Sequence, residues 1–347
     1  MRRETSERIP AVFHFVFGLQ PQKRAFPLLN YLCLRSCIEV NRPGKVYLYY
    51  QHEPHGHYWD LIKDELTLVR VGAVPLVTQF AYRDRAVRHY RYAHHADFIR
   101  LEKLLERGGV YSDMDTIFVN PLPDRLFDKP FVLGREQDVY SQRAGRLLPS
   151  LCNAFIMSRR DSEFGWRWLK RMESEFDGSW SGHSGFLPRR LSEEHPAWIQ
   201  VEPSRSFYRH ACTPAGIQTL FEECDTDFEG VYNMHLWHHM WASWWRRDYC
   251  KFHEGRLTER FIRDVDTTYN LVARRFLQAG DGRRTVVSIG ASSGQAPQRR
   301  HRRASLGDTL LTRVGLFSVS HADIAGDLWT RINRLYRRWR LRSGASV

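Results

Sequence analysis

The sequence has no run of about 18 or more apolar residues, so we expect no membrane-spanning helix. The charged segment 1–8 is followed only by a short strand-like run, and no secretory signal is visible. These two absences predict a cytoplasmic protein, at most peripheral at the inner face of the membrane. A glycine-rich phosphate loop is also missing, because residues 18–24 are only a weak version of one, and this disfavours nucleotidyl transfer.

Cysteine is scarce and follows no pattern. The six cysteines form no C-x-x-C pair, and a chain of 347 residues is long enough to fold without disulfides. We therefore expect reduced and mostly buried thiols, and we favour this interpretation over a metal site. The six residues are Cys33, Cys37, Cys152, Cys212, Cys224 and Cys250.

Acidic residues are outnumbered by basic ones. The chain has 52 lysines and arginines and 39 acids, which gives a formal net charge of +13. This balance suits anionic partners such as phosphorylated ligands, lipid head groups or nucleic acid. No recognised nucleic-acid-binding module is visible, so we predict no nucleic-acid partner.

Hydrophobic residues make up 42% of the chain and aromatic residues 13%, which is enough for a sizeable core. Compact apolar runs alternate with segments of helical periodicity. This alternation predicts an α/β fold with a largely parallel central sheet that helices cover on both faces. Strands are expected at 9–17, 46–50, 66–71, 110–119, 131–134 and 151–157, and helices at 26–40, 87–107, 164–176 and 261–277.

The composition divides the chain into three parts. Residues 1–278 are predicted to form a folded domain. Residues 279–305 are rich in Gly, Ser, Pro and Gln and contain a basic cluster, which is typical of a flexible linker. Residues 306–347 are predicted to form a C-terminal helical extension that ends in a basic amphipathic helix. We assign this tail to an anionic membrane surface, and a solvated helix or a helix packed on an acidic partner stays open as an alternative.

Three Asp-x-Asp pairs occur, and two of them have contexts that argue against a site. Asp225 and Asp227 lie in a polar, acidic segment, so we interpret them as solvated loop charges. Asp264 and Asp266 fall in a predicted helix, where residues i and i+2 do not share a face.

The third pair, Asp113 and Asp115, follows a predicted helix, a Gly-Gly stop and an apolar strand. Two acids separated by one residue on a strand point to the same side. Near a strand end they can share a hard cation such as Mg²⁺ or Mn²⁺, which takes oxygen ligands and bridges phosphate oxygens. On a diphosphate, such a metal stabilises the charge that builds as a bond to phosphate breaks.

Asp97 and Arg100 lie three residues apart on the preceding helix and so share a face. One interpretation is a surface ion pair, which contributes little. The other is that both side chains reach a pocket and hold sugar hydroxyls. The spacing alone does not separate these two.

The segment Ala96-Asp97-x-x-Arg100 and the segment 108–115, Gly-Gly-Val-Tyr-x-Asp-x-Asp, together resemble the DXD sugar-binding region of retaining glycosyltransferases. These include α-1,6-mannosyltransferase-like, α-1,4-galactosyltransferase-like and capsular-polysaccharide enzymes. Segments 9–18, 153–156 and 235–241 are similar to that family's first strand, its N-x-F-I segment and its H-x-W-x-x-x-W signature. The four motifs occur in the family's order.

This resemblance implies an A-type, Rossmann-like glycosyltransferase fold with a catalytic domain at 1–278 and Mn²⁺ or Mg²⁺ as cofactor. It implies three groups of site residues: Asp97, Arg100 and Asn153 at the donor sugar and the reacting centre; Phe13, His14, Phe15, Tyr111, Asp113 and Trp237 around the nucleotide and its diphosphate; and Asp113, Asp115 and His235 around the metal. Core packing remains an alternative for the aromatic residues, a structural histidine for His235, and a turn cap for Asn153.

The resulting hypothesis is a metal-dependent enzyme of polysaccharide biosynthesis. It would move a hexose from a UDP- or GDP-linked sugar to a glycan or lipid-linked acceptor, with retention at the anomeric carbon. The alternatives are a nucleotidyltransferase that uses the paired aspartates with Mg²⁺, and a non-catalytic basic adaptor at a membrane surface.

Overall fold

The structure is a computed structural model, which describes residues 8–82, 88, 91–141, 144–242 and 251–278. The predicted linker at 279–305 and the basic tail at 306–347 lie outside the described residues. Within the part of the chain that is described, no helix combines the length and the apolar character needed to span a membrane.

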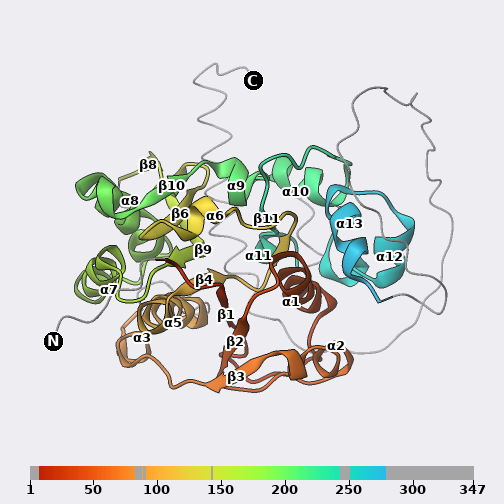
Figure 1. The fold of residues 1–347 in the computed structure, drawn as a ribbon, viewed down its shortest axis with the longest axis horizontal. Helices are drawn as coiled ribbons and strands as arrows, with labels where there is room; N and C mark the ends of the chain where they lie inside the picture. Colours follow the sequence, from red (N-terminus) through yellow and green to blue (C-terminus); the bar gives the residue numbers. More distant parts are fainter. Residues whose placement is uncertain (1–7, 83–87, 89–90, 142–143, 243–250, 279–347) are drawn as a thin grey trace, which may run out of the picture.

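A seven-stranded sheet forms the centre of the molecule, in the order β10-β6-β9-β4-β1-β2-β3 (Figure 1). β9 pairs antiparallel with β4 and β6, whereas the other pairings in this sheet are parallel. The predicted α/β class with a largely parallel sheet is therefore confirmed. The strands are β1 Val12–Val16, β2 Lys45–Tyr50, β3 Thr67–Arg70, β4 Gly109–Ser112, β6 Phe131–Arg135, β9 Leu151–Ser158 and β10 Gln200–Glu202.

Two short antiparallel ladders accompany the main sheet. One joins β5 (Thr116–Phe118) to β11 (Asn233–His235), and the other joins β7 (Val139–Ser141) to β8 (Arg146–Leu148). The first ladder brings a segment more than a hundred residues downstream against β5, which follows β4 along the chain.

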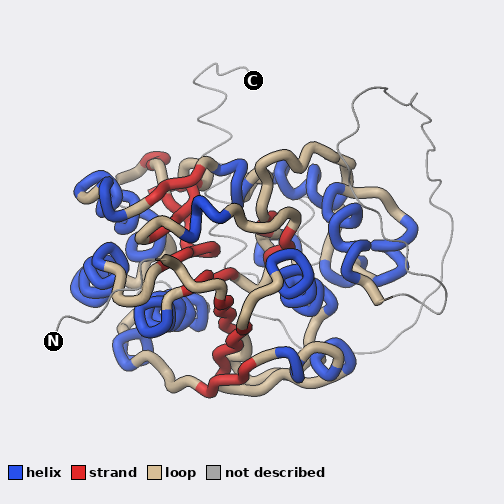
Figure 2. The backbone as a smooth tube through the Cα atoms, in the orientation of Figure 1, coloured by secondary structure: helices blue, strands red, loops and turns tan. Residues whose placement is uncertain are grey.

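Helices lie on both faces of the sheet (Figure 2). One core contains α1 (Leu28–Asn41) together with the C-terminal helices, and the other contains α5 (Arg91–Arg107) and α7 (Glu163–Glu175). Successive side chains of a strand point to opposite faces of the sheet, so Val110 packs in the first core and Tyr111 in the second. The remaining helices are α2 His57–Asp60, α3 Pro75–Gln79, α6 Asp124–Phe127, α8 Leu187–Glu194, α9 Ser204–Tyr208, α10 Pro214–Phe221, α11 His238–Trp241, α12 Glu259–Asp264 and α13 Thr268–Ala273.

The Gly-Gly stop lets α5 turn directly into β4 beside β1. Gly108 and Gly109 have φ values of +68° and +121°, which favour glycine. A Cβ on Gly109 would collide with the carbonyl oxygen of Val12 and lie 2.8 Å from His14 Nε2. These two positions therefore have room only for glycine, and they fix where β4 begins.

Two predicted elements are wrong in their extent. The single strand expected at 110–119 is two strands, β4 and β5, joined by a turn at residues 113–115. The helix expected at 261–277 is broken between α12 and α13, because Thr267 caps a new helix by accepting a hydrogen bond from the Asn270 N–H. Asp266 lies in this break, where it pairs with Arg274 at 2.9 Å.

Candidate active site

Asp113 and Asp115 lie in the turn between β4 and β5. The predicted placement by strand alternation was wrong, because the turn rather than a strand orients both side chains. Hydrogen bonds from two sides hold the turn: the Asp113 N–H donates to the Ala154 carbonyl at 2.8 Å, and the Leu236 N–H donates to the Asp115 carbonyl at 2.8 Å. The turn is thus fixed between β9 and the segment that follows β11.

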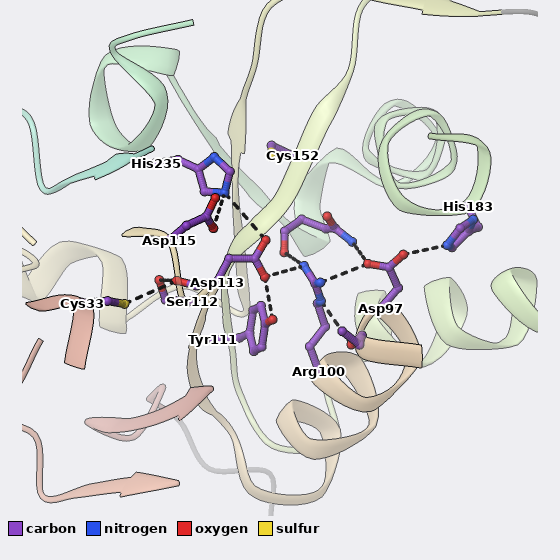
Figure 3. A network of polar contacts seen from close by, with 12 residues as sticks. Cys33, Asp97, Arg100, Tyr111, Ser112, Asp113, Asp115, Cys152, His183 and His235 are labelled. Atoms are coloured by element: carbon purple, nitrogen blue, oxygen red, sulfur yellow. Dashed lines mark hydrogen bonds and ion pairs between the residues drawn. The ribbon is translucent and has the colours of Figure 1, made fainter. Parts of the chain in front are cut away.

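His235 meets both acids from β11, as Figure 3 shows. Its Nε2 lies 3.2 Å from Asp115 Oδ1 and 3.7 Å from Asp113 Oδ2. One ligand atom from each of the three residues falls within 4.8 Å of the others. The backbone N–H of His238 also donates to Asp115 Oδ2 at 2.8 Å, so the start of α11 holds the second acid in place.

The charges in this cluster depend on one another. Burial alone would lower the pKa of His235, but the carboxylates of Asp115 and Asp113 outweigh it and raise that pKa to about 10. Burial would raise the pKa of Asp115, but His235 and the His238 N–H hold it well below its usual range. Without a metal, the imidazolium of His235 thus offsets part of the negative charge of the two acids.

The donor set fits a divalent cation. Two carboxylates and one imidazole are ligands that Mn²⁺ accepts, and the carboxylates also suit Mg²⁺. The side chains of Asp113 and Asp115 are 26% and 19% exposed, so a ligand can reach their oxygens from solvent. Asp113, Asp115 and His235 are therefore the residues that could hold such a metal.

Asp97 and Arg100 form a buried ion pair. Their side chains are 8% and 5% exposed and lie 3.1 Å apart, so the surface-pair alternative is wrong. Arg100 also contacts Asp113 Oδ1 at 3.2 Å and lies 4.5 Å from the centroid of the Tyr111 ring. Arg100 therefore joins the helix α5 to the acidic turn, and the Tyr111 hydroxyl donates to Asp113 Oδ1 at 2.6 Å.

Two further side chains hold Asp97. Asn153 Nδ2 donates to Asp97 Oδ1 at 2.7 Å, and His183 Nε2 bonds to Asp97 Oδ2 at 2.8 Å. Burial would raise the pKa of Asp97, but Arg100 and His183 outweigh it and lower that pKa. Asn153 lies in strand β9 and binds Asp97, so the alternative interpretation of Asn153 as a turn cap is wrong. Each carboxylate oxygen of Asp97 has a side-chain partner.

His183 was missed by the sequence-based prediction. It lies in a π-helical turn, Gly182–Phe186, and its carbonyl accepts a hydrogen bond from Trp168 Nε1 at 2.9 Å. A π-helical turn often marks a functional site but has no sequence signature.

Glu136 was missed as well. It follows β6, and its backbone N–H donates to the Ser150 carbonyl at 3.4 Å. Burial raises the pKa of its carboxyl group, and His235 is among the charges that act on it. Glu136 is half-buried and belongs to no sequence motif, so a single sequence could not identify it.

Comparison with known proteins agrees with this geometry. Residues 54–132 match the family described as "Glycosyltransferase sugar-binding region containing DXD motif". Glucan organizing enzyme 1 of Cryptococcus neoformans var. grubii serotype A is 31% identical over 280 residues, which cover 79% of this chain and 72% of that protein. This chain belongs to the DXD-containing glycosyltransferase family. It is an enzyme of the transferase class, and its central sheet has the largely parallel α/β architecture that the sequence predicted.

Solved structures show more distant likenesses to this glycosyltransferase. The galactosyltransferase LgtC, in complex with donor and acceptor sugar analogs, is 12% identical with a TM-score of 0.44, and the match covers 78% of this chain and 98% of that one. The PaToxG glycosyltransferase is 17% identical with a TM-score of 0.36, over 55% of this chain and 71% of that one. The family assignment depends on the sequence matches, not on these structures.

In this glycosyltransferase, Trp237 packs against His235 of the acidic cluster. Its ring centroid lies 4.2 Å from that of His235, and its Nε1 donates to the His210 carbonyl at 2.8 Å. With φ of +53°, Trp237 occupies the left-handed region that a bulky residue rarely adopts. This conformation turns the chain from β11 into α11, which brings the His238 N–H to Asp115.

Three predicted site residues of β1 are buried. Phe13 and Phe15 are 1% and 0% exposed and pack in the first core. His14 is fully buried, and its nitrogens bond to the Tyr49 hydroxyl at 2.9 Å and the Gly108 carbonyl at 2.8 Å. In this structure the three side chains are buried and pack beside β4, so their predicted place against a nucleotide base stays a prediction.

Proposed function

We propose that this protein transfers a hexose from a UDP- or GDP-linked sugar to a glycan or lipid-linked acceptor, with retention at the anomeric carbon. The observation that supports it most directly is the convergence of Asp113, Asp115 and His235 within 4.8 Å beside the buried pair of Asp97 and Arg100. Such a constellation can place a diphosphate and a sugar next to each other.

Asp113, Asp115 and His235 would hold Mn²⁺ or Mg²⁺, with Mn²⁺ the better match for the imidazole. When bound, the metal would offset the negative charge of the departing nucleoside diphosphate. In the reaction, the bond from the sugar C1 to the phosphate oxygen breaks with its electron pair on that oxygen. The acceptor hydroxyl forms the new bond to C1 and gives its proton to the released phosphate.

The protein's own residues would orient the reactants. Arg100 keeps a permanent positive charge 3.2 Å from Asp113, so it fixes the carboxylate that faces the donor. Asp97 is held by His183, Asn153 and Arg100 and would present a rigid ionised group to the sugar hydroxyls. Preorganised charge of this kind stabilises a transition state without reorganisation.

The relative's name directs the first choice of substrates. Because that protein is called a glucan organizing enzyme, UDP-glucose and glucan oligosaccharides are the first donor and acceptor to test. A role in polysaccharide biosynthesis or capsule formation, and attachment of residues 306–347 to an anionic membrane surface, are further parts of this proposal.

Screening UDP- and GDP-sugars with Mn²⁺ tests the proposed reaction. We expect release of free nucleoside diphosphate from one donor and loss of this activity in the presence of a chelator. Release of pyrophosphate instead would indicate nucleotidyl transfer, and no turnover of any nucleotide would favour a non-catalytic adaptor. The family assignment supports neither of these alternatives.

A further inference from the structure

An exposed tryptophan stands beside the candidate active site. Trp180 is 44% exposed, and Trp166 is the other exposed tryptophan among the residues that the structure describes, at 49%. The Trp180 ring lies between two elements of the site, with its centroid 6.2 Å from that of His94 on α5 and 6.2 Å from that of His239 on α11. The same helices position Asp97 and Asp115.

Packed aromatic rings back the inner side of Trp180. His94 is 1% exposed, and its ring centroid lies 4.8 Å from that of His183, which bonds to Asp97. Phe176 packs against both histidine rings, at 5.3 Å and 4.9 Å. The inner side of Trp180 thus rests on a rigid layer that continues to Asp97, while nearly half of its surface faces solvent.

The segment that carries Trp180 is also held in place. Ser184 Oγ donates to the Trp180 carbonyl at 3.0 Å, and the Ser179 N–H donates to Asp177 Oδ1 at 2.9 Å. The π-helical turn that follows presents His183 to Asp97. Backbone constraints therefore fix Trp180 relative to the carboxylate beside which the sugar would react.

An exposed indole has a specific use at such a place. The indole offers a broad apolar ring to solvent, and a ligand that covers the ring removes apolar surface from water. One face of a pyranose ring presents C–H groups that pack on an aromatic ring, while its hydroxyl groups stay free for hydrogen bonds at the rim. The donor's diphosphate belongs at the acids, so this outer surface suits the substrate that arrives from solvent.

We propose that Trp180 is the platform on which a sugar ring of the acceptor stacks. This inference rests on the proposed function and adds to it that the acceptor is a carbohydrate whose terminal or penultimate ring lies against α11 and the π-helical turn. Trp180 thereby selects acceptors with an apolar pyranose face.

The test compares full-length Trp180→Ala and Trp180→Phe with Trp166→Ala, a control at a similarly exposed tryptophan on α7. Laminaritriose, cellotriose and maltotriose serve as acceptor probes with the donor that the wild type hydrolyses. For Trp180→Ala we expect the KM for the preferred trisaccharide to rise about tenfold, and the ratio of transfer to donor hydrolysis to fall by a similar factor. Trp180→Phe should recover most of the loss, and Trp166→Ala should match the wild type.

A binding assay without donor separates this inference from the proposed function. Trisaccharide binding is followed by ligand-detected NMR on folded variants, checked by circular dichroism. Loss of binding in Trp180→Ala but not in Trp166→Ala supports the platform even if no donor is turned over. Equal binding and equal KM in the wild type and Trp180→Ala, a parallel loss of transfer and donor hydrolysis, or a wild type that binds none of the probes would overturn it.

Discussion

The turn at 113–115 and the loop at 225–227 share the Asp-x-Asp spacing but not the surroundings. Asp225 Oδ2 accepts two hydrogen bonds from Arg209, at 3.1 Å and 2.7 Å, and Asp227 pairs with Arg205 at 2.6 Å. These acids are thus paired loop charges, close to the solvated charges that the sequence predicted. Asp115, in contrast, faces a histidine and a backbone N–H.

The difference at Asp115 teaches that the partner of an acid affects what the acid can bind, and it concerns Asp115 alone because Asp113 also contacts an arginine, Arg100. Arginine keeps its proton under all ordinary conditions, so the carboxylates of Asp225 and Asp227 stay neutralised. The imidazolium of His235 can lose its proton and become a metal ligand instead. The spacing of two aspartates alone therefore does not identify a site.

The largest predicted effect is that of a substitution at Asp115. Replacing Asp115 by Asn removes a charge that faces His235 and the proposed metal, so donor hydrolysis and transfer should fall by about a thousandfold or more. The same replacement at Asp227 should leave both rates within about twofold. Release of nucleoside diphosphate measures both variants, and comparable rates for Asp115→Asn and the wild type would contradict the assignment.

The next effect concerns how Asp97 is held. Replacing His183 by Ala removes the partner of Asp97 Oδ2, so we expect kcat to fall about thirtyfold while Mn²⁺ affinity stays the same. His183→Asn, which keeps a donor, should recover part of the loss. A fall in Mn²⁺ affinity as large as the fall in kcat would instead assign His183 to the metal cluster.

Acid should weaken the scaffold of the 113–115 turn before it weakens the pairs at 225–227. Burial lowers the pKa of His14 from 6.5 to about 4, and does the same for His94 and His210. As the pH falls, the unfolded chain binds a proton on each of these histidines before the folded protein does. The free energy of unfolding therefore decreases between pH 6.5 and 4, by on the order of 3 kcal/mol for each histidine at the end of this range.

The pairs at 225–227 respond in a different pH range. The pKa of Asp225 is lowered from 3.8, so its contribution is lost only below that pH. Urea unfolding at pH 7, 5.5 and 4.5 should show a steep loss of stability in the wild type and a shallower one in His14→Gln. Identical slopes in these two proteins would count against the buried neutral histidine.

The smallest effect is on the stability of the exposed pair. Asp227→Asn breaks a contact with Arg205 in which the two side chains are 54% and 39% exposed. Such pairs contribute at most about 1 kcal/mol, so the free energy of unfolding should change by less than that. A larger loss, measured by urea unfolding at neutral pH, would show that the loop at 225–227 supports the fold more than its exposure implies.

Local pattern was sufficient for most strands of the main sheet and for the end of α5. The apolar runs gave β1, β2, β3, β6 and β9, and Gly108 and Gly109 marked the end of α5. The sequence could not show that residues 113–115 form a turn, because that depends on hydrogen bonds to Ala154 and Leu236 from distant segments. It also gave no reason to bury His14 between Tyr49 and Gly108.

Contacts between distant segments limited the prediction of the site. His235 could be proposed from the family signature, but its distance to Asp115 depends on the pairing of β5 with β11. His183 reaches Asp97 from 86 residues away through a π-helical turn. Both placements depend on tertiary packing, which one sequence without its relatives does not specify.

Direct measurement of metal binding tests the central claim. Isothermal titration of the full-length protein with Mn²⁺ at neutral pH should give one site per chain in the wild type and in Asp227→Asn, and no binding in Asp115→Asn. The titration of the wild type should also release protons, because the metal displaces the proton of His235. Undiminished Mn²⁺ binding by Asp115→Asn would contradict the account.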